Sequence, residues 1–243
     1  MPYSNPDYNK IAGFYDHVIG SDVFGSLIKD YLEKYYKKGS DILELGCGTA
    51  INLKSLFPFY NVEGIDISDK MLSIARKKLP QVKFYRQNIK NFKVVKKYDA
   101  ILCLYDTINH IKGLNNWSRI FRNVKKHLKE SGVFIFDINT LYKLNFLHEE
   151  PASVIAFGKN FLIMNVVRKN SISKENIFSW NMRIFDKTSK NNYTLTEKSI
   201  MEYGYEVSSI IKDLNKYFKS VKVLNSDLRP AGKYSDRIFF ICK

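Results

Sequence analysis

The segment Asp41–Ala50, with the sequence DILELGCGTA, constrains the fold more than any other part of the chain. Alternating apolar residues lead through Glu44 into a turn formed by Gly46 and Gly48, and the next apolar run ends in Asp66. This pattern predicts a strand, a tight glycine-rich turn, a helix and a second strand that ends in a carboxylate. Such a unit binds a nucleoside, because the turn lets the ligand approach the backbone and the second carboxylate reaches the ribose hydroxyls.

Two cofactor classes use a unit of this kind, the dinucleotides and S-adenosylmethionine. The dinucleotide fingerprint G-x-G-x-x-G requires a third glycine, and Ile51 stands at that position. The carboxylate of Glu44 also suits a cationic ligand better than a pyrophosphate, since it can receive a methionine amino group directly or through water. The sequence therefore favours S-adenosylmethionine over a dehydrogenase cofactor, and it disfavours a chance glycine turn after a core strand.

The stretch from Glu44 to Ala50 resembles motif I of the class I S-adenosylmethionine-dependent methyltransferases, whose usual form is (D/E)-x-G-x-G-(T/S)-G. The last glycine alone departs, as Ala50. The resemblance implies an enzyme that transfers a methyl group from S-adenosylmethionine and releases S-adenosylhomocysteine.

Charge and cysteine content bound the partners of the chain. The net charge of +15 raises nucleic acid as a partner, but only eight of the 39 basic residues are Arg and no basic run forms a tail. Nucleic-acid binding is therefore not expected. Cys47, Cys103 and Cys242 lie in apolar runs without metal-ligand spacing, which fits a reducing cytoplasm. The polar N-terminus is not expected to be a signal peptide, and no apolar run approaches membrane-spanning length.

Short apolar segments that alternate with helical patterns predict a parallel sheet buried on both faces. These strands are expected at 41–46, 61–67, 82–87, 99–105 and 132–139. A helix is expected at 69–79, with Ser68 as N-cap. Another carries an apolar stripe from Trp117 to Leu128 and is expected to end at the stop signal KESG over 129–132. Residues 1–40 are expected to be helical in two pieces broken near 20–25.

The pattern changes after residue 139. Phe178, Trp180, Met182 and Ile184 alternate with polar residues, and turn residues over 186–192 precede another strand that begins at Tyr193. This predicts an inserted antiparallel sheet. A helical stripe over 207–218 follows, and strands at 221–224 and 237–242 are expected to complete the main sheet.

The whole chain resembles the class I methyltransferase fold, an α/β fold with a doubly wound, seven-stranded, mostly parallel sheet whose last strand is antiparallel. The expected core comprises 1–140 and 202–243, including an N-terminal helical lid, and the antiparallel insert comprises 141–201. The insert lies where small-molecule members of the family place a substrate cap.

Ligands in a doubly wound sheet bind outside the carboxyl ends of the strands. Asp66 is expected to bind the ribose hydroxyls, and Asn88 to accept a bond from the adenine amino group, where the family usually has an acidic residue. Ile67, Met71 and Ile89 are expected to sandwich the adenine, with ordinary core packing as the alternative. The predicted cofactor-binding residues are Tyr15, Glu44, Gly46, Gly48, Asp66, Ile67, Met71, Asn88, Ile89 and Leu104.

Within the family the chain most resembles the sugar N-methyltransferases of antibiotic pathways. Three segments carry the resemblance: 11–16 (IAGFYD), 103–110 (CLYDTINH) and 132–139 (GVFIFDIN). The resemblance implies that Tyr15 belongs to a helical lid and lines the active site, and that His110 faces the acceptor. A neutral imidazole can take a proton from the acceptor at neutral pH. A structural histidine and a tyrosine that only packs are the alternatives for these two residues.

The sequence thus predicts a methyltransferase that acts on an amine or hydroxyl of a small molecule, without a metal. An RNA methyltransferase, suggested by charge, and a non-catalytic protein that binds S-adenosylmethionine are the competing hypotheses. The acceptor and the choice between monomer and homodimer stay open.

Overall fold

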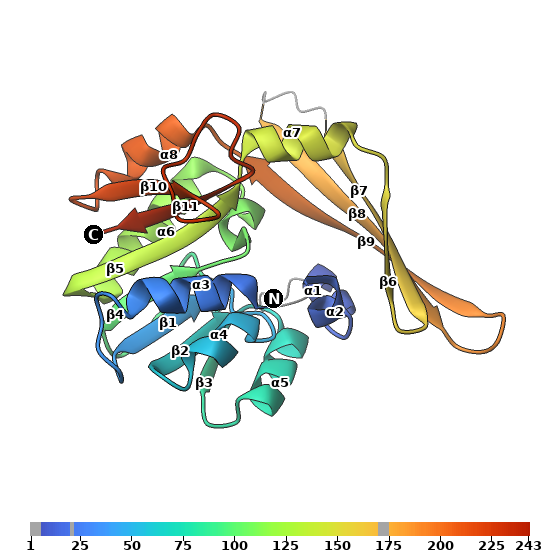
Figure 1. Cartoon of the computed structure of the whole chain (residues 1–243), viewed down its shortest axis with the longest axis horizontal. Helices are drawn as coiled ribbons and strands as arrows, with labels where there is room; N and C mark the ends of the chain where they lie inside the picture. Colours follow the sequence, from blue (N-terminus) through green and yellow to red (C-terminus); the bar gives the residue numbers. More distant parts are fainter. Residues whose placement is uncertain (1–5, 20–21, 170–174) are drawn as a thin grey trace.

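The main sheet of the computed structural model has seven strands in the order β10-β11-β5-β4-β1-β2-β3 (Figure 1). The structure describes residues 6–19, 22–169 and 175–243. Within these ranges β11 runs antiparallel to both of its neighbours, and the other strand pairs of this sheet are parallel. The predicted fold class is confirmed. The strands are β1 (Asp41–Leu45), β2 (Asn61–Asp66), β3 (Lys83–Arg86), β4 (Tyr98–Cys103), β5 (Leu128–Asn139), β10 (Val221–Asn225) and β11 (Arg237–Cys242).

Helices cover both faces of this sheet (Figure 1). One face packs against α3 (Val23–Leu32), α4 (Ile51–Leu56) and α5 (Asp69–Lys78), and the other against α6 (Leu114–His127) and α8 (Val207–Leu214). The predicted apolar stripe of α6 is fully buried there. Apolar helix faces packed on both sides explain why the central strands carry almost no polar residues away from their ends.

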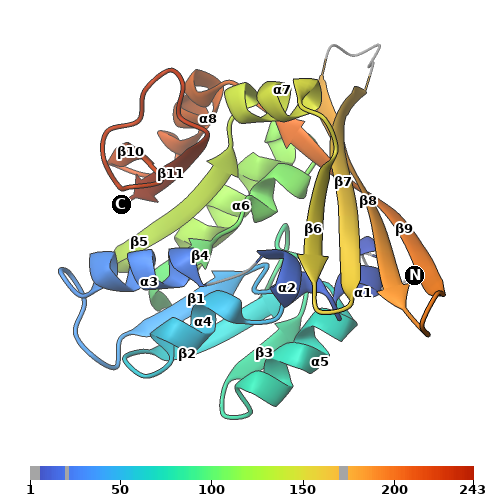
Figure 2. The same ribbon diagram turned by 45° about the vertical axis from the view of Figure 1, so that its right-hand side comes forward.

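The insert is a separate antiparallel sheet of four strands in the order β6-β7-β8-β9, which extends beyond the core (Figure 2). Its strands are β6 (Ser153–Phe157), β7 (Asn160–Lys169), β8 (Asn176–Lys187) and β9 (Tyr193–Gly204). The sequence pattern had predicted the last two. The others carry apolar residues at successive positions, so period-2 alternation does not reveal them. The helix α7 (Leu141–Glu149), also not predicted, leads into this sheet, and the exact domain boundary stays a prediction.

The N-terminal region contains α1 (Pro6–Ile11), α2 (Tyr15–Ile19) and α3, rather than two helical pieces. Residues 20–21 of the predicted break lie outside the described residues. Gly25 is within α3, because Asp22 caps the helix by accepting a hydrogen bond from the Gly25 amide at 2.9 Å. Both views show α1 and α2 between the core and the four-stranded sheet (Figures 1 and 2). The pair therefore occupies the place of a lid.

The boundary between α6 and β5 differs from the prediction, because Leu128 is the first residue of β5. It pairs with Tyr98, and the register then shifts before Val133 pairs with Ala100. The ammonium of Lys129 bonds the carboxylate of Asp99 at 2.7 Å. These contacts hold the segment beside β4, so the helix ends at His127, before the stop signal predicted at 129–132, and β5 begins four residues earlier than predicted.

The buried side chain of Asn109 joins the two sheets. Its amide donates to the carbonyls of Asn139 in β5 and Tyr203 in β9 at 3.2 and 3.3 Å, and its oxygen accepts from the Asn139 amide at 3.2 Å. It lies in the 3₁₀ helix η1 (Thr107–His110), which follows β4. One buried amide thus fixes the position of η1 against both sheets.

We expect Asn109→Ala to lower the free energy of unfolding by roughly 2 kcal/mol, because buried backbone groups would lose their partner. Asn116→Ala is the control, since the exposed Asn116 amide bonds only the nearby Lys112 carbonyl in the described structure. Urea unfolding of both variants measures the difference. Equal unfolding midpoints for the two would contradict the assignment.

Candidate active site

A cleft of about 150 Å³ opens where β1, β2 and β4 lead into their loops. It brings together most of the predicted site residues. Those that line it are Tyr15, Gly46, Gly48, Asp66, Ile67, Met71, Asn88, Ile89 and His110. The topology therefore gathers these side chains as the switch-point rule for doubly wound sheets requires.

The glycine turn after β1 has the conformation that its sequence predicted. Gly46 and Gly48 have φ of 70° and 51°, a region that favours glycine. A Cβ on Gly46 would lie 2.3 Å from the Thr107 methyl, so glycine is also needed for space. Ala50 has φ of 63°, which explains why motif I usually has glycine there.

Asp66 connects the turn to the loop after β2. Its carboxylate accepts hydrogen bonds from the amides of Gly48 at 2.9 Å and Ser68 at 2.7 Å. Burial raises the pKa of Asp66, and these bonds oppose that shift. Asp66 lines the cleft, and ribose binding by its carboxylate stays a prediction.

Glu44 and Leu104 do not line the cleft. Both are buried beneath it, and the Leu104 carbonyl accepts a bond from the Thr107 hydroxyl at 2.8 Å. One carboxylate oxygen of Glu44 accepts from the Asn52 amide at 2.6 Å, while the other is buried without a partner among the described residues. Burial raises the pKa of Glu44 to about 8. A buried carboxyl oxygen that lacks a donor fits the ammonium group of a methionine moiety.

The predicted adenine contacts surround one end of the cleft. Met71 and Ile89 are almost fully buried, and both face the cleft together with Ile67. The side-chain oxygen of Asn88 accepts a bond from the Lys90 amide at 2.9 Å. A second lone pair on this oxygen is left for an adenine amino group. The adenine contacts stay predictions.

A second cavity, of about 460 Å³, lies between the lid and the four-stranded sheet. It shares four wall residues with the cleft: Tyr8, Tyr15, Tyr105 and His110. The sequence analysis had not singled out Tyr8 or Tyr105. Tyr8 and Tyr15 belong to two different helices, α1 and α2, so no helical spacing in the sequence relates them. The shared wall is where a group can pass from one ligand to the other.

The loop after β4 presents two consecutive residues in the left-handed region, Tyr105 and Asp106, with φ of 54° and 49°. Such a conformation is costly for residues other than glycine and marks functional sites. The Asp106 amide donates to the Asp137 carboxylate at 3.0 Å, and the Tyr105 ring packs on Phe24 at 4.6 Å between centroids. These contacts point both side chains into the cavity.

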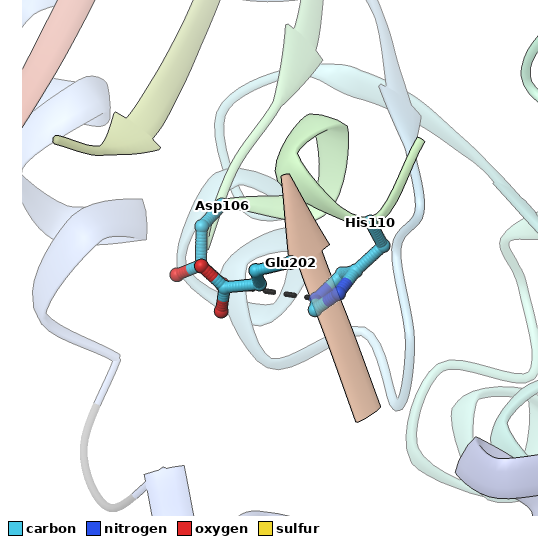
Figure 3. A group of neighbouring side chains, drawn as sticks. All are labelled: Asp106, His110 and Glu202. Carbon is cyan, nitrogen blue, oxygen red and sulfur yellow. Dashed lines mark ion pairs between the residues drawn. The ribbon is translucent and has the colours of Figure 1, made fainter. Parts of the chain in front are cut away.

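A charged cluster of Asp106, His110 and Glu202 stands at one end of this cavity (Figure 3). Their ligand atoms lie within 4.8 Å of one another, and the two carboxyl groups share a hydrogen bond. The guanidinium of Arg237 bonds Asp106 at 2.7 Å and also bonds Asp137. Glu202, on β9, is outside the predicted set, and it comes next to Asp106 only through the second sheet.

The two carboxyl groups of this cluster differ in protonation. Burial raises the pKa of Glu202, and the charge of Asp106 raises it further. Burial would also raise the pKa of Asp106, but Arg237 and His110 hold it below its usual value. At neutral pH the proton therefore resides on Glu202, which donates to the carboxylate of Asp106.

His110 is held by hydrogen bonds at both ring nitrogens. Its Nδ1 is 2.9 Å from the Met201 carbonyl, which can only accept, so Nδ1 carries the proton of the neutral ring. Nε2 then accepts from the Tyr8 hydroxyl at 2.8 Å. Nε2 also lies 3.7 Å from the Asp106 carboxylate. This arrangement suits a group that accepts a proton at Nε2.

The lid is tied to the cofactor side of the core. The Asp16 carboxylate in α2 accepts from the Thr49 hydroxyl, next to the glycine turn, and from the Lys78 ammonium in α5. The Asn9 oxygen in α1 accepts from the Ser68 hydroxyl at 2.6 Å. Both lid helices therefore contact loops that form the cleft.

Comparison with known proteins agrees with this architecture. Residues 42–132 match the family described as methyltransferase domain. An S-adenosylmethionine-dependent methyltransferase from Clostridium acetobutylicum ATCC 824 has a similar structure, with 26% identity, a TM-score of 0.81 and coverage of 97% of this chain and 98% of that one. The sugar N-methyltransferase KedS8 from Streptoalloteichus sp. ATCC 53650 shares the fold, with 14% identity, a TM-score of 0.77 and coverage of 95% and 91%.

One sequence relative has a name that specifies its reaction. The dTDP-3-amino-3,6-dideoxy-alpha-D-glucopyranose N,N-dimethyltransferase of Streptomyces fradiae is 25% identical over 44% of this chain and 42% of its own length. Together with the fold, these findings support an S-adenosylmethionine-dependent methyltransferase. The predicted enzyme class and cofactor are confirmed, whereas each residue's contact with the cofactor stays a prediction.

We expect Asp66→Ala to weaken S-adenosylhomocysteine binding by about 1.5–3 kcal/mol, because a charged hydrogen-bond acceptor is lost. Isothermal titration calorimetry measures the affinity. The control is Asp69→Ala, since the more exposed Asp69 pairs with Arg86 at 2.6 Å and does not line the cleft. Unchanged affinity in the Asp66 variant would refute the assignment to ribose.

We expect S-adenosylhomocysteine binding at pH 7 to release a proton from Glu44, whose pKa of about 8 keeps it neutral in the free protein until a cation approaches. Titrations in buffers of different ionisation enthalpy measure this release, and Glu44→Gln should abolish it. In the free protein, the raised pKa means that Glu44 favours folding fully below pH 4.5 and that this contribution is lost as the pH rises through 8. Equal proton release by the Gln variant would exclude Glu44 as its source.

Proposed function

We propose that this enzyme transfers a methyl group from S-adenosylmethionine to an amine nitrogen of a small molecule. One observation carries the proposal: an imidazole and two carboxyl groups stand together at the end of a cavity whose wall is shared with the cofactor cleft. A cationic acceptor in this cavity would find the Asp106 carboxylate, the neutral carboxyl group of Glu202 and a proton acceptor, His110, beside the place of methyl transfer.

The net charge of the cluster supports an amine over a hydroxyl. Arg237 supplies one positive charge to two carboxylates, Asp106 and Asp137. Burial raises the pKa of Asp137 to about 6, against the opposing effect of Arg237, so it is mostly ionised at neutral pH. These three residues together carry one excess negative charge, which an acceptor ammonium would neutralise.

The acceptor nitrogen must lose a proton before its lone pair can attack. In the proposed route the ammonium gives a proton to the Tyr8 oxygen, while the Tyr8 hydroxyl proton moves to His110 Nε2, 2.8 Å away. Burial raises the pKa of Tyr8, so a lasting tyrosinate is disfavoured and the transfers are coupled. The carboxylate of Asp106 stabilises the imidazolium.

Bound S-adenosylmethionine supplies an electrophilic methyl group on a sulfonium sulfur, which keeps the electron pair when the carbon–sulfur bond breaks. The protein's contribution is to align the nitrogen with that methyl group and to exclude water. Tyr8 and Tyr15 suit this role, because both are half-buried and line both ligand spaces. The relatives that methylate amino sugars support an amine acceptor of this general kind.

We further propose a cytoplasmic location and a small-molecule rather than a nucleic-acid partner. The three free cysteines are all buried, which supports a reducing compartment. None of the described helices combines the length and apolar character needed to cross a membrane.

We expect His110→Ala to lower turnover by about 10²-fold or more, because it removes the proton acceptor. S-adenosylhomocysteine affinity should stay close to that of the wild type, and His148→Ala, at an exposed position on α7, is the control. The assay follows methyl transfer to a panel of small amines by mass spectrometry. Tyr8→Phe should lower turnover in the same direction, and adding a high buffer concentration should partly rescue it. If His110→Ala retains full turnover, His110 is structural.

A further inference from the structure

We infer that the acceptor amine is attached to a compact apolar body and carries no phosphate. The inference rests on the proposed function and goes beyond it, because it specifies the part of the acceptor that is not methylated. It also separates this enzyme from the relatives whose names specify dTDP-linked amino sugars.

The four-stranded sheet gives the cavity one continuous apolar wall. Strand pairing places Met164 beside Met182, and Trp180 beside Ile200, so these side chains come from neighbouring strands on one face. The apolar residues that this sheet contributes to the cavity are Ile155, Met164, Trp180, Met182, Ile184 and Ile200. Such a wall contributes binding energy by removing apolar surface from water. Among these six side chains only the Trp180 indole nitrogen can donate a hydrogen bond, and it is buried without a partner among the described residues.

Polar groups gather at the opposite end of the cavity, and the structure already uses them. The Asn139 amide donates to the Glu202 carboxyl at 3.1 Å, and its oxygen accepts from Arg237 at 3.0 Å. A sugar ring carries hydroxyls around its whole edge, and each needs a partner when it is buried. Among the described residues that line the apolar wall, the Trp180 indole N–H is a single donor, so most hydroxyls of a sugar would lose hydration there without compensation.

The cations that line the cavity are also engaged. Among the described lining residues these are Arg237 and Lys143. Arg237 is bound to Asp106 and Asp137, and the Lys143 ammonium lies 3.2 Å from the Asp236 carboxylate. A nucleotide diphosphate needs cationic partners, preferably arginine in bidentate contact. If Arg237 left its pairs to bind phosphate, the buried carboxylates of Asp106 and Asp137 would lose their cation and repel the phosphate, so this end of the cavity disfavours anionic acceptors.

The cavity size fits one compact ligand. A volume of about 460 Å³ lies in the usual range for small-molecule sites. Two of the wall residues are methionines, whose unbranched side chains adapt to different shapes. A monocyclic or short-chain amine fills this space with its nitrogen at the carboxyl cluster and its body on the sheet.

The test compares amines that differ in the polarity of the body. Purified wild-type enzyme with S-adenosylmethionine is assayed with cyclohexylmethylamine, phenethylamine, free 3-amino-3,6-dideoxyglucose and the dTDP derivative of that sugar. We expect kcat/KM for the better apolar amine to exceed that for either sugar by at least about tenfold, from apolar burial alone. Preference for either sugar overturns the inference and leaves the proposed function intact. Methylation of no amine, with S-adenosylhomocysteine still bound, refutes the proposed function itself.

Substitutions at the apolar wall distinguish an effect of wall polarity on acceptor preference from a general loss of activity. Ile155→Asn should lower the ratio of kcat/KM for the apolar amine to that for the free amino sugar by about tenfold. Its neighbour Val154 is 67% exposed and does not line the cavity, so Val154→Asn should leave the ratio unchanged. Met182→Gln, a change of nearly equal volume, is expected to lower the ratio in the same way. It replaces Ile155→Asn in the test if that variant does not fold. An unchanged ratio in a folded wall variant contradicts the inference.

Discussion

One guanidinium, that of Arg237, fixes the geometry on which the acceptor side of this site depends. Arg237 is the first residue of β11, the strand that runs antiparallel in the main sheet, and its side chain reaches the ends of β4 and β5. By bonding Asp106 and Asp137 together, it holds the strained loop after β4 against the sheet. The two carboxylates in turn raise the pKa of Arg237 despite its burial, so its charge is permanent.

The second sheet completes what the core cannot supply alone. The core provides the cleft, the glycine turn and the loop that carries His110. The insert adds the apolar wall and Glu202, and β9 also orients His110 through the Met201 carbonyl. In the proposed mechanism the insert therefore has two roles: β9 orients His110, and all four strands contribute to the wall that contacts the acceptor.

Local signals accounted for most of the cofactor side. The turn at Gly46 and Gly48 and the carboxylate of Asp66 are close in sequence, so the pattern predicted their common cleft, and the seven-stranded fold followed from alternating strands and helices. The acceptor side depends on contacts across the chain. Glu202 is an ordinary polar residue on a half-exposed strand until the second sheet brings it to Asp106. Two strands of that sheet, β6 and β7, were not predicted because they carry apolar residues at successive positions and show no period-2 alternation.

The position of Tyr8 and Tyr15 in the walls of both ligand spaces has a thermodynamic consequence. The lid helices that carry them are bonded to the glycine turn and to the helix after Asp66. A ligand that shifts the lid from either side therefore alters the other space. If a ligand in the cleft changes the affinity of the cavity for its ligand by some factor, a ligand in the cavity changes the affinity of the cleft by the same factor. The residues that line both spaces thus couple the occupancy of the cleft to the occupancy of the cavity.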